Sequence, residues 1–248
     1  MPDQYSRTAM LIGREKLDTL KDKRVAIFGI GGVGGYVVES LARFGIGNFE
    51  LVDDDIFCLS NINRQILATM STCGKNKVDV AENRIHDINP EINVIKHKTF
   101  YLPNNKDEFD FNKYDYVVDA LDTITAKIDI IMEAKEHNVP VISAMGCGNR
   151  LDPTKLVIGD LFETKGDPLS KVMRHELKKR GISSLKVVYS LEPPTRPLES
   201  EVEKEADPSK KPSRKDVPGS SSFVPPVAGT LIGYAVAMDL LKEQAKNQ

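Results

Sequence analysis

The sequence predicts an α/β fold: a Rossmann-like, doubly wound, mostly parallel sheet with helices on both faces and an irregular C-terminal extension. Short β-rich runs alternate with segments whose apolar residues recur every three or four positions, as in strands and helices. A glycine-rich turn directly follows the first such run, 24–29 (RVAIFG). The chain has 248 residues, of which 40% are hydrophobic, so it can bury one sizeable core.

The expected elements follow one another in a regular order. Strands are expected at 24–29, 49–52, 92–95, 114–120 and 140–144, with added strands at 155–158 and 185–189. Helices are expected at 33–44, 75–88, 126–137 and 167–180, and a buried helix at 227–241 closes the fold. This alternation predicts that candidate ligands bind beyond the carboxyl ends of the strands.

Composition argues against several classes of protein. The formal net charge of −2 gives no overall attraction to nucleic acid, so an RNA partner needs a local basic patch. Cys58, Cys73 and Cys147 include no CxxC pair, which argues against a disulfide framework or four-cysteine zinc site and favours a reducing cytoplasm. The most apolar stretch, 224–241, contains two prolines, two glycines and an aspartate, so we expect no membrane span.

A glycine motif at 29–34 (GIGGVG) predicts a nucleotide site. The motif has the form G-x-G-x-x-G, lies between a strand and a helix, and consists of Gly29, Gly31, Gly32 and Gly34. Glycines let phosphates approach the backbone, and the following helix offers amides and a positive dipole. Asp53, at the end of the second strand, can accept hydrogen bonds from a ribose. The alternative is a tight turn with no ligand.

The charged residues that follow favour ATP over a dinucleotide. Arg64, within 61–65 (NINRQ), and Lys77 reach the same sheet edge and can neutralise a triphosphate. Asp122, after the fourth strand, is a candidate magnesium ligand. Taken singly, each cation could be a solvated surface charge, and Asp122 could cap the next helix. Asp55 could face the site or belong to a turn.

Together these motifs resemble the ubiquitin-activating-enzyme superfamily, which includes proteins that adenylate sulfur carriers in molybdopterin and thiamine synthesis. The similarity spans 4–148 and comprises the glycine loop, the acidic strand end 53–55, N-x-x-R-Q at 61–65, Lys77 and D-x-x-D at 119–122. It implies carboxylate adenylation with ATP and magnesium. The residues that it assigns to the nucleotide and metal are Asp53 on the ribose, Asn61, Arg64 and Lys77 on the phosphates, and Asp122 on magnesium, with Asp55 and Gln65 beside them.

An N-terminal Y-x-R at 5–7 is also similar to the superfamily. The resemblance implies that Arg7 reaches the nucleotide of a partner subunit in a homodimer. By default an exposed arginine near a chain end is a solvated charge.

The C-terminal part of the chain separates the branches of the superfamily. Because no cysteine follows Cys147, zinc held by two CxxC pairs and a downstream thioester are excluded. Segments 146–155 (GCGNRLDPTK), 166–169 (GDPL) and 223–226 (FVPP) resemble the tRNA threonylcarbamoyladenosine dehydratase branch. That resemblance implies adenylation of the threonylcarbamoyl carboxylate on a tRNA adenosine, then ring closure with net loss of water.

Ring closure needs no protein nucleophile, because the attacking atom is already tethered to the acyl group. We therefore interpret Cys147 as a packed side chain rather than a nucleophile. Basic residues are the candidate tRNA contacts, although a solvated helix face is the alternative for each lysine. They are Arg150, Lys155, Lys165, Lys171, Arg174, Lys178, Lys179 and Arg180.

Three other functions remain open on the sequence. An adenylyltransferase could activate the C-terminus of a ubiquitin-like sulfur-carrier protein, which would then be the partner in place of tRNA. An NAD-dependent oxidoreductase would explain the glycines but leave Arg64, Lys77 and Asp122 without a role. A non-catalytic adaptor would bind magnesium-ATP without turnover.

We interpret the chain as a single adenylating domain in five parts. These are an N-terminal helix and dimer arm (1–22), a nucleotide-binding core (23–150), a substrate-side extension (151–191), a mobile segment (192–222) and a closing helix (223–248). The mobile segment is rich in Pro, Lys, Glu and Ser, and it has too few apolar residues to offset the entropy lost on ordering.

Overall fold

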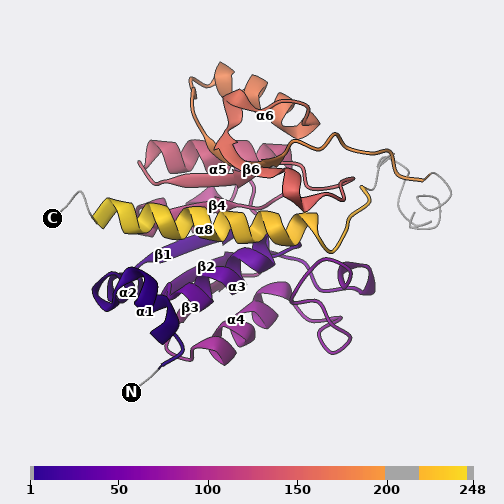
Figure 1. The fold of residues 1–248 in the computed structure, drawn as a ribbon. Coiled ribbons are helices and arrows are strands. Elements are labelled where there is room, and N and C mark those ends of the chain that lie inside the picture. The colour runs from indigo at the N-terminus through magenta and orange to yellow at the C-terminus, as the bar shows by residue number, and fades with distance from the viewer. Residues whose placement is uncertain (1–2, 199–217, 245–248) are drawn as a thin grey trace.

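A seven-stranded sheet runs through the molecule in the order β3-β2-β1-β4-β5-β7-β6. Its strands are β1 (Arg24–Phe28), β2 (Asn48–Val52), β3 (Asn93–His97), β4 (Tyr116–Asp119), β5 (Val141–Ala144), β6 (Leu156–Asp160) and β7 (Lys186–Ser190). Neighbouring strands are parallel except for the antiparallel pair β6 and β7. The computed structural model, drawn in Figure 1, describes residues 3–198 and 218–244. The strand order reverses between β1 and β4, which is where such sheets bind ligands.

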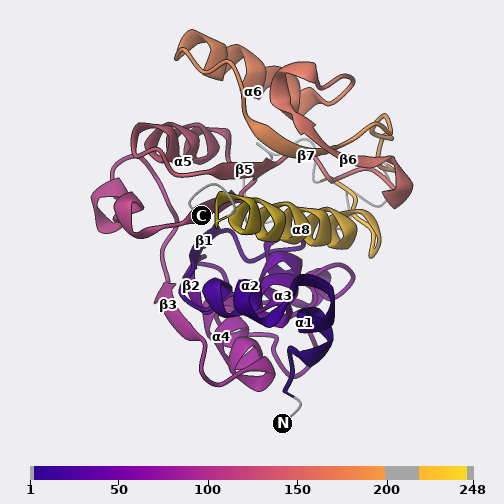
Figure 2. The same ribbon diagram turned by 60° about the vertical axis from the view of Figure 1, so that its left-hand side comes forward.

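Helices cover both faces of this sheet (Figures 1 and 2). One layer contains α2 (Arg14–Leu20), α3 (Gly34–Phe44), α4 (Lys77–Ile88) and α8 (Val224–Gln244); the other contains α5 (Ile124–Glu136) and α6 (Pro168–Lys179). Short 3-10 helices lie at Leu59–Asn61, Lys106–Glu108, Phe111–Lys113, Pro153–Lys155 and Leu161–Glu163. The predicted doubly wound fold is confirmed.

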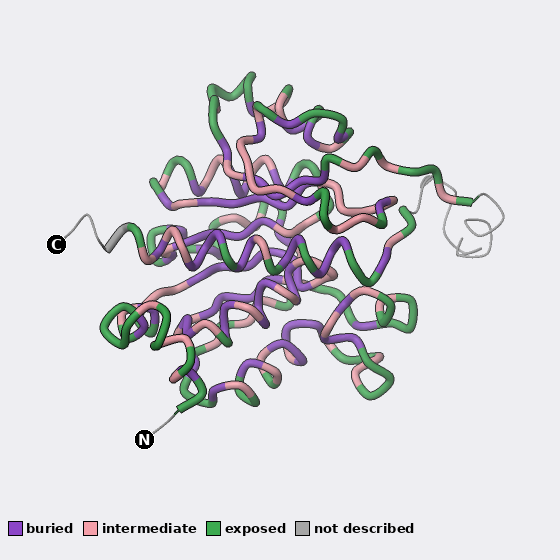
Figure 3. Tube along the Cα trace, viewed as in Figure 1, coloured by how far each residue is buried: buried purple, intermediate pink, exposed green. Residues whose placement is uncertain are grey.

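Successive side chains of each strand point alternately into two hydrophobic cores, one on each face of the sheet. In β1, Val25 and Ile27 belong to the core beneath α3 and α8, whereas Ala26 and Phe28 belong to the core beneath α5. Successive side chains of a strand point to opposite faces, so a strand covered on both sides must be apolar throughout. Figure 3 shows the consequence, with buried residues along the strands and exposed residues on the outer turns of the helices.

The N-terminal segment forms two helices rather than the one expected within 1–22. Helix α1 (Ser6–Ile12) ends at Gly13, which has φ of 85° and also precedes α2. Tyr5 anchors this region, because its hydroxyl donates to the Ala42 carbonyl at 3.1 Å and accepts from Asn89 at 3.0 Å. The break at Gly13 lets α1 turn away from α2 while Tyr5 stays buried.

Helix α8 departs from the sequence expectation in one respect. It is continuous from Val224 onwards, because Pro225 and Pro226 occupy its first turn, where no backbone hydrogen bond is lost. The stretch Val224–Lys242 is long and apolar enough to cross a membrane by length and composition. However, 61% of it is buried inside the fold, where α8 packs along α3, as the core helix of a globular fold does.

The segment predicted to be mobile, 192–222, lies partly outside the described residues. Positions 199–217 are not described. The flanking pieces, 192–198 and 218–222, form no helix or strand, and residues of both contact the loop at 146–150, which follows β5.

Candidate functional site

A cavity of about 350 Å³ lies at the carboxyl ends of β1, β2 and β4, within the size range of small-molecule sites. Ten of the residues predicted to bind the nucleotide line it: Gly29, Gly31, Gly32, Asp53, Asp55, Asn61, Arg64, Gln65, Lys77 and Asp122. Of the predicted set, Gly34 and Arg7 do not line this cavity. The expected convergence of separate strand ends is therefore present.

The glycine loop is held in place by Asp53. The Ile30 amide donates to Asp53 Oδ2 at 2.7 Å, and the Asp55 amide donates to Asp53 Oδ1 at 2.9 Å. Burial raises the pKa of Asp53, and the positive charge of Lys77 opposes that shift. Asp53 thus fixes the turn while it faces the cavity.

Two glycines of the motif have distinct structural tasks. Gly29 has φ of 92° and lies against the end of β4, where a Cβ would be 2.8 Å from the Ala120 carbonyl oxygen. Gly34 does not face the cavity; a Cβ there would lie 1.8 Å from the Gly29 carbonyl oxygen. Its role is to let α3 begin tightly against the loop. Helix α3 has no side-chain cap, and the Gly35 and Tyr36 amides already donate to the Gly31 and Val33 carbonyls, so the helix would act on a phosphate mainly through its positive dipole.

Lys77 is a buried cation at the edge of the cavity. Its Nζ lies 2.7 Å from Asp55 Oδ2 and 3.7 Å from Asp53 Oδ1, and its side chain is 7% exposed. Asp55, in contrast, is 67% exposed. The sequence analysis left open whether Asp55 faces the site or belongs to a turn, and the structure shows both. Asp55 lines the cavity, and its backbone carbonyl accepts a hydrogen bond from the Lys77 amide, which closes the turn.

The 61–65 motif contributes a second cation and an unpaired acceptor. Arg64 donates through Nη1 to the Ser60 carbonyl at 2.8 Å and to Asn63 Oδ1 at 2.9 Å. Gln65 is buried, and its Oε1 has no hydrogen-bond partner within 3–198 and 218–244. Since buried acceptors are rarely left unpaired, a ligand donor in the cavity fits this position.

A buried lysine that the sequence analysis missed supports the end of β4. Lys127 is fully buried, with Nζ 2.8 Å from Asp119 Oδ2. It also donates to the Leu121 carbonyl at 3.1 Å and the Ala144 carbonyl at 2.8 Å. It therefore fixes the backbone just before Asp122, which is itself exposed at the cavity. The burial of Lys127 could have been suspected from the sequence, because this lysine lies within the apolar stripe of a predicted helix.

Further lining residues come from segments that the sequence analysis did not place at the nucleotide site. They are 99–101 after β3, Cys147 and Gly148 after β5, 218–220, and Pro225 at the start of α8. The residues after β3 and β5 could have been predicted, because they directly follow the carboxyl end of a strand. Nothing in the sequence indicated that 218–220 folds back to this edge.

The residues present fit a magnesium ion that is held mainly by phosphates. The described part of the chain contains no group of three or more His, Cys, Asp or Glu side chains that could hold a metal. Magnesium in nucleotide sites commonly uses one or two carboxylates, with the remaining positions filled by phosphates and water. Asp122 meets that requirement.

Arg7 cannot serve the cavity of its own chain. Arg7 is exposed on α1. The residue just before α1, Tyr5, lines a groove together with Gly47 and Ile92. Those residues precede β2 and β3, so α1 lies at the amino ends of the strands, opposite the cavity. The structure therefore does not place Arg7 with the other predicted nucleotide residues of its own chain.

Cys147 lines the cavity, but it is not poised as a nucleophile. Burial raises the pKa of its thiol to about 12, and its sulfur lies 3.5 Å from the Met145 carbonyl oxygen. The thiolate is the reactive form, so the sequence interpretation of a packed side chain agrees with the structure.

The predicted tRNA contacts differ in exposure, with one buried, one half-buried and six exposed. Arg150 is 3% exposed and pairs with Asp167, so the prediction that it contacts tRNA was wrong. Arg174 is half-buried and donates to Thr164. The remaining six are exposed: Lys155, Lys165, Lys171, Lys178, Lys179 and Arg180.

Known proteins share both this sequence and this fold. A model of the ThiF family matches residues 5–237. The chain is 44% identical over 246 residues to the tRNA threonylcarbamoyladenosine dehydratase of Bacillus subtilis, covering 98% of this chain and 96% of that protein. The structure is similar to that of the Escherichia coli tRNA N6-threonylcarbamoyladenosine dehydratase in complex with ATP, with a TM-score of 0.87, 29% identity, and coverage of 99% and 96%. For the AMP complex of the same enzyme the TM-score is 0.86 at 30% identity, with coverage of 98% and 96%.

Replacing Lys77 should weaken ATP binding. We expect Lys77→Met to raise the dissociation constant for magnesium-ATP about tenfold or more, because it removes a charged donor next to the phosphates. Lys75→Met is the matched control, since Lys75 is exposed and does not line the cavity. Calorimetric titration of both variants checks this, and equal affinities would contradict the assignment.

Cys147 should resist alkylation. At pH 8 its thiolate is a minute fraction of the thiol, because the pKa is raised to about 12, whereas Cys58 is exposed. Mass spectrometry after brief iodoacetamide treatment should find the label on Cys58 and not on Cys147. Preferential labelling of Cys147 would show that its thiol is activated.

Proposed function

The chain belongs to the ThiF family, and we propose that it is an ATP-dependent enzyme that dehydrates threonylcarbamoyladenosine in tRNA. The observation that carries the proposal is the set of charged groups around one cavity: Lys77 and Arg64 for the phosphates, Asp53 for the ribose and Asp122 for magnesium. The relatives described above supply the substrate, since that nucleoside stands in their names.

The first step joins the substrate carboxylate to the nucleotide. A carboxylate oxygen of the threonylcarbamoyl group attacks the α-phosphorus of ATP, and the bond to pyrophosphate breaks. Two anions must approach each other, so the step is slow without cations. Arg64 and Lys77 offset this repulsion and stabilise the charge that moves onto pyrophosphate. Magnesium held by Asp122 would supply further positive charge at the same place.

The second step releases AMP. A nitrogen or oxygen of the same threonylcarbamoyl group attacks the activated acyl carbon, loses its proton, and displaces AMP as the ring closes. The net change in the nucleoside is the loss of one water. Tethering makes this attack fast without a protein nucleophile, in keeping with the half-buried thiol of Cys147, whose pKa is raised.

We further propose that the enzyme is a homodimer in which Arg7 reaches the partner's nucleotide. Arg7 is too far from its own cavity, as shown above. Exposed apolar side chains offer a surface for a second copy, with Met10 and Leu11 on α1 at 82% and 85% exposure, and Val227 and Tyr234 on α8 at 36% and 58%.

A cytoplasmic location is also proposed. The three cysteines are all free thiols, which suits a reducing compartment.

A ubiquitin-like sulfur carrier remains the alternative substrate for the same chemistry. Pyrophosphate exchange that needed such a carrier instead of modified tRNA would favour it.

Loss of one water from the nucleoside tests the proposed reaction. Incubation with magnesium-ATP and tRNA carrying threonylcarbamoyladenosine should lower the nucleoside mass by one water. Arg64→Ala and Asp122→Ala should each reduce the rate about 100-fold, as removal of one transition-state contact typically does. Arg43→Ala is the control, because Arg43 lies on α3 outside the cavity and pairs with Glu39. Full turnover by either site variant would remove that residue from the mechanism.

A mixing experiment tests the action of Arg7 across the dimer. We expect Arg7→Ala and Lys77→Met to be nearly inactive alone, whereas an equal mixture after subunit exchange should regain about one quarter of wild-type activity. Half of the dimers are then mixed, and each contains one intact site. No recovery despite proven exchange would contradict the assignment.

A further inference from the structure

The cavity has two walls of different character. One is formed by the glycine loop, the end of β2 and the start of α4, and it includes Lys77; Arg64 lies beside it. The other is formed by Cys147, Gly148 and 218–220, while 120–122 packs against Gly29 of the glycine loop and belongs with the first wall. Among the lining residues of the described chain, the second wall contains no cation. We therefore expect the phosphates of the nucleotide to lie against the first wall, which leaves the second wall for the acyl group of the second substrate.

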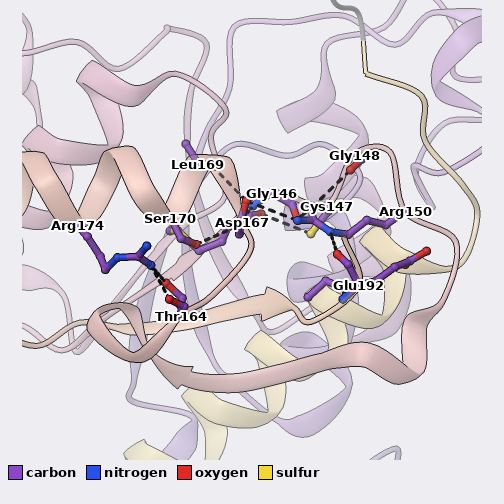
Figure 4. A network of polar contacts seen from close by, with 12 residues as sticks. Gly146, Cys147, Gly148, Arg150, Thr164, Asp167, Leu169, Ser170, Arg174 and Glu192 are labelled. Carbon is purple, nitrogen blue, oxygen red and sulfur yellow. Dashed lines mark hydrogen bonds and ion pairs between the residues drawn. The ribbon is translucent and has the colours of Figure 1, made fainter. Parts of the chain in front are cut away.

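Asp167 does not line the cavity, but its contacts, drawn in Figure 4, hold the second wall in place. Asp167 is 3% exposed, and its Oδ2 accepts from the Gly146 amide at 3.1 Å and from the Ser170 hydroxyl at 2.8 Å. Its Oδ1 accepts from the Leu169 amide at 3.1 Å, which caps α6. One carboxylate thus joins the first turn of α6 to the start of the loop at 146–149.

Arg150 is the buried partner of Asp167. Its Nη2 lies 3.5 Å from Asp167 Oδ1 and has no hydrogen-bond partner in the described structure. Its other nitrogens donate to the carbonyls of Gly146 and of Glu192, the latter at 2.9 Å. A buried ion pair adds little net stability, because desolvation offsets the attraction. A role in fixing the geometry of the 146–149 loop explains this pair better.

The loop glycines fit this arrangement closely. A Cβ at Gly146 would lie 3.0 Å from Asp167 Oδ1 and 3.2 Å from Arg150 Nη1. A Cβ at Gly148 would lie 2.8 Å from the Pro218 Cβ. A side chain at Gly148 would displace Pro218, and one at Gly146 would crowd the Asp167 pair, so the 146–149 loop is packed between that pair on one side and Pro218 on the other.

Asn149 extends the same support to the 218–220 part of the wall. Its amide donates to the Gly219 carbonyl at 2.7 Å, and its Oδ1 accepts from the Gly219 amide at 2.7 Å. Its carbonyl accepts from the Thr195 amide at 2.8 Å. A shift of the 146–149 loop would therefore move Gly148 and 218–220 together.

We propose that Asp167, paired with Arg150, is a positioning residue that sets the wall receiving the threonylcarbamoyl group of the tRNA, and not the wall that holds ATP. The inference rests on the proposed function. It explains why two motifs that are separate in the sequence, 146–150 (GCGNR) and 166–169 (GDPL), are joined by the ion pair between Arg150 and Asp167. Misplacement of such a wall weakens substrate alignment more than nucleotide binding.

Asp167→Asn tests this, because asparagine retains an oxygen that can cap α6 but loses the charge that pairs with Arg150. We expect the KM for modified tRNA to rise about tenfold or more, while the dissociation constant for magnesium-ATP stays within about twofold. Asp160→Asn is the matched control. Asp160 also caps a helix, accepting from the Phe162 amide at 2.8 Å and the Ser184 hydroxyl at 2.6 Å, and it does not line the cavity.

A double variant keeps the test valid if Asp167→Asn is unstable. Asp167→Asn with Arg150→Gln removes both charges, so no uncompensated buried charge remains. We expect the melting temperature to recover towards wild type while the KM for modified tRNA stays raised. Recovery of KM together with stability would overturn the positioning role, as would an unchanged KM in folded Asp167→Asn or a parallel loss of ATP affinity.

The wild-type assay separates the two levels of the argument. If the unaltered protein removes no water from the nucleoside, the proposed function fails and this inference fails with it. If the wild type is active and Asp167→Asn behaves like Asp160→Asn, only the inference fails.

Discussion

The site depends on a buried ammonium held between two carboxylates. Lys77 Nζ lies 2.7 Å from Asp55 and 3.7 Å from Asp53, and this contact joins the start of α4 to the end of β2. The two carboxylates offset the cost of burying the ammonium charge. With them, a cation is kept ready at the cavity edge before a nucleotide arrives. Asp53 also holds the glycine loop through the Ile30 amide, so the phosphate loop and the phosphate cation share one anchor.

Separate strands contribute to this site because parallel strands end at one edge of the sheet. The reversal of strand order between β1 and β4 opens the crevice, and Lys127 then fixes the chain before Asp122 from within the core. In the proposed reaction, the first wall would hold ATP and the second would align the acyl group. Polyphosphate binding and substrate alignment would then use different elements of the fold.

Much of this could be predicted from local sequence, because periodicity and turn residues encode strands, helices and the glycine loop. The strand and helix positions from 24 to 190 agree with the structure, and ten predicted nucleotide-site residues line the cavity. The exceptions depend on long-range packing. Arg150 looks like a surface cation in sequence, and only the fold brings Asp167 to it. The approach of 218–220 to the cavity likewise depends on Asn149, about 70 residues away. Lys127 was overlooked because burial of a lysine depends on partners from two other strands.

In the proposed reaction a carboxylate is activated at the α-phosphorus of ATP, and the fate of the carboxylate oxygen tests this activation most directly. Modified tRNA with heavy oxygen in the threonylcarbamoyl carboxylate should be incubated with the enzyme and magnesium-ATP for a single turnover. We predict that one heavy oxygen appears in AMP, since the acyl–oxygen bond breaks when the ring closes. Heavy oxygen in inorganic phosphate, with ADP as the nucleotide product, would contradict adenylation.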